Sequence, residues 1–132
     1  MIHTDIRSDN LRFRQGSLVL FDWAGVCQGP CIFDVYAFLP SLVAEGGPAA
    51  EGPLETYRQA MHLGGLLIPR KAEQAAASAV AGYFARRAGQ PPIPGLPRLR
   101  QAQRLQLGTA LDLAAVTLEL TPRHGCSRRS IR

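Results

Sequence analysis

The spacing of apolar residues changes near residue 31 of this 132-residue chain, and this change limits the folds open to it. Before that point, the short apolar runs "LRF" and "SLVLFD" flank the turn "RQG". This pattern predicts a β-hairpin over residues 11–22, with Gly16 in the positive-φ turn position. After it, longer apolar stretches recur at helical spacing. The sequence therefore predicts a mainly α protein of the α+β class, with a loop and a short hairpin before about four helices.

Glycine- and proline-rich breaks separate the segments that we expect to be helical. Residues 31–44, "CIFDVYAFLPSLVA", are predicted to form a buried helix that Pro40 kinks or ends. Residues 54–65 and 69–89 are predicted to form the next two helices. After "QPPIPGLP", residues 98–120 are predicted to form a long amphipathic helix. The expected apolar side of that helix comprises Leu99, Ala102, Leu105, Leu107, Leu111, Leu113, Val116 and Leu120.

The length is that of one domain, which we expect to span residues 1–122. Within it, residues 1–30 hold the loop and hairpin, and residues 31–122 hold the helices. Residues 123–132 are the most basic part of a chain with a formal net charge of +5. We expect this segment to be a disordered basic tail. Because the other arginines are scattered along the chain, we expect no nucleic-acid partner.

Cysteine usage and hydropathy predict the compartment. Cys27, Cys31 and Cys126 contain no CxxC pair, and with His124 they match no zinc spacing. We therefore expect reduced thiols. No signal segment opens the sequence, and no apolar run approaches the ~20 residues that a membrane helix needs. The prediction is a cytoplasmic protein with no membrane partner.

Two short motifs carry residues suited to phosphoryl transfer, namely "HTDIRSDN" at residues 3–10 and "LVLFDW" at residues 18–23. This reaction needs a positioned nucleophile and cations that bridge phosphate oxygens. Asp5, on a loop, can accept the proton of an acceptor hydroxyl. Asn10 and Asp22 can each offer an oxygen to Mg²⁺, which commonly takes only one or two side-chain ligands.

These motifs resemble the catalytic loop and metal-binding strand of the aminoglycoside phosphotransferase family, small-molecule kinases with a protein-kinase-like fold. The family's loop is His-Gly-Asp-Leu-x-x-x-Asn, and its strand ends in Asp-Trp or similar. The resemblance implies that Asp5 is the catalytic base and that His3 anchors the loop. It implies that Asn10 and Asp22 bind Mg²⁺. A further Asp of the family, which braces the loop, corresponds to Asp34 here.

The sequence departs from the family pattern at three places within residues 1–44, the region that the resemblance covers. Thr4 replaces the loop glycine, a change that is tolerable if φ is negative there. Arg7 stands where the family often has His or another polar residue. The family's Gly-Asp-Pro before the buried helix is matched only loosely by "GPC". None of these changes removes a chemical group that the reaction needs.

The resemblance implies ATP and Mg²⁺ as cofactors and a small-molecule hydroxyl as acceptor, but the nucleotide-binding first lobe has no counterpart here. Only Met1 and Ile2 precede His3, and the chain has no glycine-rich phosphate loop. We therefore expect the C-terminal lobe of a protein-kinase-like phosphotransferase, inactive alone. Met1 would then be a wrong start or the start of a fragment, and a longer chain or a partner would supply the first lobe.

Two alternatives remain open from the sequence. The chain could instead be a non-enzymatic remnant or a helical binding module that retains the motifs as structure.

If it is a kinase lobe, helices after residue 50 would line the acceptor pocket. Because these helices contain few acidic residues, we expect a neutral or anionic hydroxyl compound rather than a polycationic drug.

Overall fold

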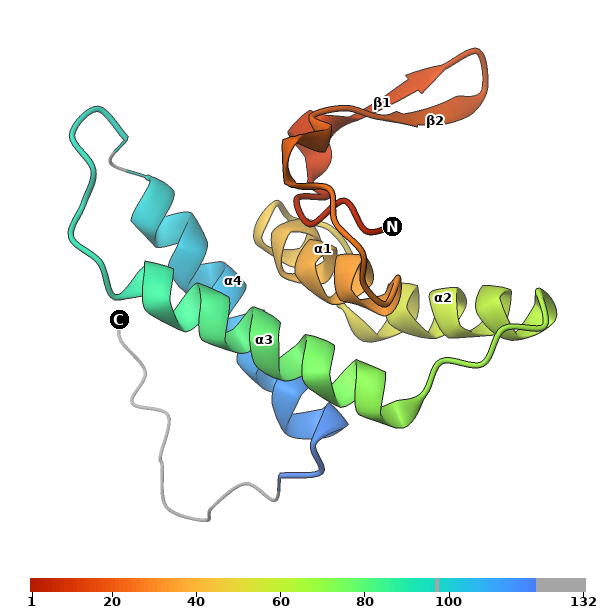
Figure 1. Cartoon of the computed structure of the whole chain (residues 1–132). Helices are drawn as coiled ribbons and strands as arrows, with labels where there is room; N and C mark the ends of the chain where they lie inside the picture. The colour runs from red at the N-terminus through yellow and green to blue at the C-terminus, as the bar shows by residue number, and fades with distance from the viewer. Residues whose placement is uncertain (97, 121–132) are drawn as a thin grey trace.

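A computed structural model describes residues 1–96 and 98–120 of the chain (Figure 1). In this part, a loop and a two-stranded hairpin precede four α-helices, so the predicted α+β class is confirmed. The hairpin projects away from the helices, whereas the N-terminal loop lies beside helix α1 (Ile32–Ala44) (Figure 1). The predicted tail at 123–132, which includes Cys126 and His124, lies outside the described residues.

The hairpin has the turn that its sequence predicts. Strands β1 (Leu11–Arg14) and β2 (Ser17–Leu20) pair antiparallel. Gln15 and Gly16 connect them with φ values of 50° and 77°. Two consecutive positive φ values are those of a type I′ turn, whose twist matches that of the strands. The positive φ predicted for Gly16 is confirmed.

The helices agree with the predicted segments except at two prolines. Helix α1 continues through Pro40 to Ala44, so the alternative in which Pro40 ends it is wrong. Helix α2 is Glu51–Leu63 and begins three residues earlier than predicted. Pro53 falls in its first turn, where a backbone N–H has no helical partner to lose. Helices α3 (Arg70–Ala88) and α4 (Leu99–Thr117) complete the order.

The core lies between α1, α3 and α4, and α3 packs most extensively on α4. Alanines on α3 allow the two helix backbones to approach closely because their side chains are small. The Tyr36 hydroxyl lies 2.9 Å from Thr117 Oγ1 and so connects α1 to the end of α4. The buried apolar residues of this core are Ile32, Tyr36, Leu39, Ala50, Leu54, Ala76, Ala77, Val80, Ala81, Phe84, Ala110, Leu113 and Ala114.

The predicted apolar side of α4 is wrong in part. Leu105, Leu111 and Val116 are all more than half exposed. Ala110 and Ala114 are buried instead, because small side chains fit against the alanine-rich α3. Apolar residues occur around most of this helix, so spacing alone does not select the buried side.

The first turns of α4 bury polar residues. The Arg100 guanidinium donates to the Pro91 carbonyl at 2.9 Å and to Gln103 Oε1 at 2.6 Å. The bond to Pro91 attaches the connection before α4 to the helix, and the bond to Gln103 lies within α4. Among the helices of the described residues, none has both the length and the apolar character of a membrane span.

The difference in burial between Leu39 and Leu63 predicts a contrast between two Leu→Ala variants. Leu39 is fully buried in α1, whereas Leu63, at the end of α2, is 87% exposed. Leu39→Ala should lower the free energy of unfolding by about 2–5 kcal/mol because it leaves a cavity. Leu63→Ala should change it by no more than about 0.5 kcal/mol. Urea unfolding followed by circular dichroism measures both, and equal effects would contradict the placement of α1 in the core.

Candidate active site

Asp34, in the first turn of α1, fixes the N-terminal loop. Its Oδ2 accepts a hydrogen bond from the His3 backbone N–H at 2.7 Å. Its Oδ1 accepts one from the Thr4 backbone N–H, also at 2.7 Å. Bonds to an ionised acceptor are roughly twice as strong as neutral ones. The Asp34 side chain therefore holds the N-terminal loop against the start of α1.

His3 connects this loop to the end of β2. Its side chain is buried, and Nε2 lies 2.7 Å from the Phe21 carbonyl oxygen. The Asp5 backbone N–H donates to Nδ1 at 3.3 Å. A neutral ring with its proton on Nε2 satisfies both bonds. Because both nitrogens are used within the protein, His3 has the geometry of a structural anchor.

Asn10 holds the side chain of Asp5. Its Nδ2 donates to the Asp5 carbonyl oxygen at 2.9 Å and to the Asp5 carboxylate oxygen Oδ2 at 3.1 Å. Asn10 is buried, whereas Asp5 is exposed. Within the described part of the chain, Oδ1 of each residue has no hydrogen-bond partner. Asp5 Oδ1 is therefore available to a substrate hydroxyl.

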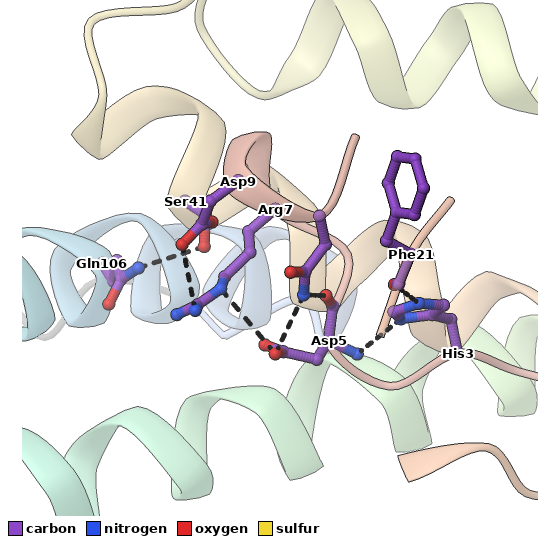
Figure 2. A network of polar contacts seen from close by, with 8 residues as sticks. His3, Asp5, Arg7, Asp9, Phe21, Ser41 and Gln106 are labelled. Carbon is purple, nitrogen blue, oxygen red and sulfur yellow. Dashed lines mark hydrogen bonds and ion pairs between the residues drawn. The ribbon is translucent and has the colours of Figure 1, made fainter. Parts of the chain in front are cut away.

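Arg7 also belongs to the site. From the sequence, it was noted only as a departure from the family pattern. Its Nε lies 3.7 Å from Asp5 Oδ2, and its Nη2 lies 3.0 Å from Asp9 Oδ2 (Figure 2). The alternation of acid and base at residues 5, 7 and 9 was the available signal. Because all three side chains are about half exposed, solvent weakens these ion pairs.

Asp22 directly follows the residue that pairs with Asn10. The Phe21 backbone N–H donates to the Asn10 carbonyl oxygen at 2.9 Å, so the two predicted metal ligands come from adjoining backbone segments. The Asp22 side chain is exposed and makes no hydrogen bond or ion pair with any described residue. Its own φ is 57°, a conformation that Asp tolerates better than most residues.

The donor chemistry of this pair fits Mg²⁺. Asn10 Oδ1 and the Asp22 carboxylate are hard oxygen ligands, and Mg²⁺ usually completes such a set with water and substrate phosphates. No group of three or more His, Cys, Asp or Glu side chains suited to a metal occurs in residues 1–96 and 98–120. A metal here would therefore depend on phosphate oxygens for its remaining ligands.

Thr4 has a conformation that the sequence did not predict. Its φ is 71°, so the condition under which threonine would replace the glycine without strain, a negative φ, is not met. A β-branched residue is strained in this region, and such strain persists only where the surroundings impose it. Two bonds impose it here, the N–H bond to Asp34 and a bond from Thr4 Oγ1 to the Gly25 carbonyl oxygen at 3.1 Å.

A cleft of about 980 Å³ lies between the loop and helices α1, α3 and α4. Asp5 and Arg7 line it from the loop side. Helices α1, α3 and α4 line the cleft from the other side, and no described residue of α2 does. The other lining residues are Thr4, Ile6, Ser8, Asp9, Phe33, Ala37, Ser41, Glu45, Val80, Tyr83, Phe84, Arg87, Leu99, Ala102, Gln103 and Gln106.

Tyr57, on helix α2, lies beside Cys31 at the start of α1. Burial raises the pKa of the Tyr57 hydroxyl most, and contact with Cys31 and the nearby Asp34 carboxylate raise it further. Tyr57 is therefore neutral at ordinary pH beside the helix end that carries Asp34. Cys27 and Cys31 are exposed, free thiols.

The contact between Thr4 and Gly25 predicts a coupled effect of two substitutions. A Cβ atom at Gly25 would lie 2.4 Å from Thr4 Oγ1. Gly25→Ala should therefore cost about 1–3 kcal/mol of unfolding free energy through overpacking. In a Thr4→Gly background the same change should cost less, because the clashing oxygen is gone. Urea unfolding of all four proteins measures the coupling, and strictly additive effects would contradict the contact.

Comparison with known proteins gives no counterpart to this site. The chain matches no family model, no curated protein and no solved structure. Any function assigned to the chain therefore depends on its own residues and their geometry.

Proposed function

We propose that this chain is the C-terminal catalytic lobe of an ATP-dependent small-molecule phosphotransferase with a protein-kinase-like fold. One observation carries the proposal. The Asp5 carboxylate lines a cleft of about 980 Å³, and the Asn10 amide holds one of its oxygens while the other stays available. A carboxylate fixed in this way at a cleft wall is suited to act as a general base.

The reaction assigned to the cleft is a single transfer. An acceptor hydroxyl binds with its O–H directed at Asp5 Oδ1, and Asp5 takes the proton as the hydroxyl oxygen forms its bond to the γ-phosphorus. The bond from that phosphorus to the bridging oxygen breaks, and ADP leaves. Asn10 Oδ1 and the Asp22 carboxylate would hold Mg²⁺, which neutralises negative charge on the phosphates. Asp34 and His3 keep the loop in place.

The proposal requires a first lobe, and the hairpin offers a surface for it. Directly opposite residues of a hairpin share one side, so Phe13 and Leu18 project together. They are 82% and 54% exposed. A two-stranded hairpin with an uncovered apolar side is marginal by itself. We propose that a nucleotide-binding lobe, from a longer chain or a partner, covers it in the cytoplasm, where ATP is available.

Metal binding tests the assignment of Asp22. When the chain is expressed with any sequence encoded in frame before Met1, Mn²⁺, a paramagnetic substitute for Mg²⁺, should bind in the presence of ADP. Asp22→Asn should weaken this binding at least ~10-fold through loss of a charged ligand. Asp9→Asn is the matched control, because Asp9 is a neighbouring exposed acid that pairs with Arg7. Water-proton relaxation measures both. Equal weakening by the two variants would remove Asp22 from the site.

Transfer activity tests Asp5. The chain should be expressed together with any sequence encoded in frame before Met1 and assayed for ATP-dependent phosphorylation of hydroxyl compounds. Asp5→Asn should lower kcat by about 10²–10⁴-fold, the contribution of a general base, with an unchanged unfolding midpoint. An unchanged kcat would exclude Asp5 as the base. Absence of any Asp5-dependent transfer would favour the non-enzymatic remnant or helical binding module.

A further inference from the structure

The wall of the cleft that faces the catalytic loop carries uncharged polar groups. Gln106 on α4 donates from Nε2 to Ser41 Oγ on α1 at 3.0 Å, and Figure 2 shows this pair in the same view as Asp5, Arg7 and Asp9. Ser41 is buried, yet it lines the cleft. Its hydroxyl proton and Gln106 Oε1 have no partner in the part of the chain that the structure describes. One hydrogen-bond donor and one acceptor are thus available side by side.

Gln103 adds a second donor, one helical turn from Gln106. Its Oε1 accepts from Arg100 at 2.6 Å, and this bond fixes the orientation of the amide. The Nε2 group makes no hydrogen bond to the described residues. Gln103 is buried and lines the cleft. An amide fixed in this way can donate to a ligand oxygen without first being ordered.

The charges around the cleft leave little attraction for a charged acceptor. Arg7 pairs with Asp9 at 3.0 Å and with Asp5 at 3.7 Å, and Asp5 is needed for proton transfer. Arg87 stacks over the Tyr83 ring, with its guanidinium carbon 4.7 Å from the ring centroid, and Glu45 is the remaining acid. One unpaired cation and one unpaired carboxylate select neither a polycation nor a phosphorylated compound.

We propose that the acceptor is an uncharged polyhydroxy compound, such as a sugar or a cyclic polyol. This inference rests on the proposed phosphotransferase function and specifies its substrate class. Hydroxyl groups both donate and accept, so they complement the Ser41 hydroxyl and the two glutamine amides. The aromatic rings of Phe33 and Phe84 supply apolar surface for the carbon face of a sugar ring. The cleft volume is within the usual range for small-molecule sites.

Three probes with the same ring test the substrate class on the full chain. D-Glucose is neutral, glucosamine is cationic and glucose 6-phosphate is anionic, and binding is measured by saturation-transfer NMR titration. Glucose should bind at least as tightly as the other two. Gln106→Leu should weaken glucose binding about tenfold, because it removes a hydrogen-bonding partner from the cleft. Gln101→Leu is the matched control, an exposed position on the same helix outside the cleft.

Four results would overturn this substrate class. The first two are tenfold tighter binding of glucosamine, or of glucose 6-phosphate, than of glucose. The third is an equal effect of Gln106→Leu and Gln101→Leu on glucose binding, and the fourth is no binding of any probe. If Gln106→Leu fails to fold, Ser41→Ala removes the neighbouring donor and should weaken glucose binding in the same direction. The metal and Asp5 experiments report separately on phosphoryl transfer. If those experiments give the expected results but glucose does not bind, the phosphotransferase function is supported and the neutral acceptor is contradicted.

Discussion

The site depends on the two hydrogen bonds that the Asp34 carboxylate accepts from the backbone of the N-terminal loop. They are the point at which the loop is joined to the helical core. Asp34 lies in the first turn of α1, where the helix dipole favours a negative charge. Two residues later in the same helix, Tyr36 is buried in the core. The position of the loop is therefore set by the packing of α1.

From that junction, short polar contacts fix each further residue. His3 connects the loop to the Phe21 carbonyl, and Asn10 holds Asp5. Thr4 accepts a strained φ because its N–H and its hydroxyl are both bound. The strain is thus a cost of the loop conformation next to Asp5, and the two bonds made by Thr4 offset that cost.

The sequence predicted the fold class, the hairpin turn and the order of the helices, because each depends on local patterns. Apolar spacing is read within one helix, and the turn at Gly16 is set by two residues. It did not predict the buried side of α4, which depends on how closely Ala110 and Ala114 approach α3. That information lies in the tertiary packing and not in the helix itself.

The candidate site, too, was predicted only in part. Asp5 and Asn10 were predicted from motif spacing, and Asp34 was implied by the family resemblance. In the structure Asn10 bonds to Asp5, and Asp34 on α1 accepts a bond from the loop backbone at Thr4. The ion pairs of Arg7 and the Ser41–Gln106 pair were not predicted. Ser41 and Gln106 are 65 residues apart and meet only because α1 and α4 pack together. A pattern within one segment carries no signal for such a contact.

The separation between the loop and its brace has a consequence for the order of folding. Asp34 is 30 and 31 residues along the chain from its two loop partners. Its own helix is held by α3 and α4, which come later still. Contacts of this length carry a loop-closure cost that local helices do not. During synthesis, Asp5 therefore leaves the ribosome well before the helices that give it a fixed place. The loop that carries Asp5 is therefore made before the helix that braces it, and it can take its place only after α1 has packed.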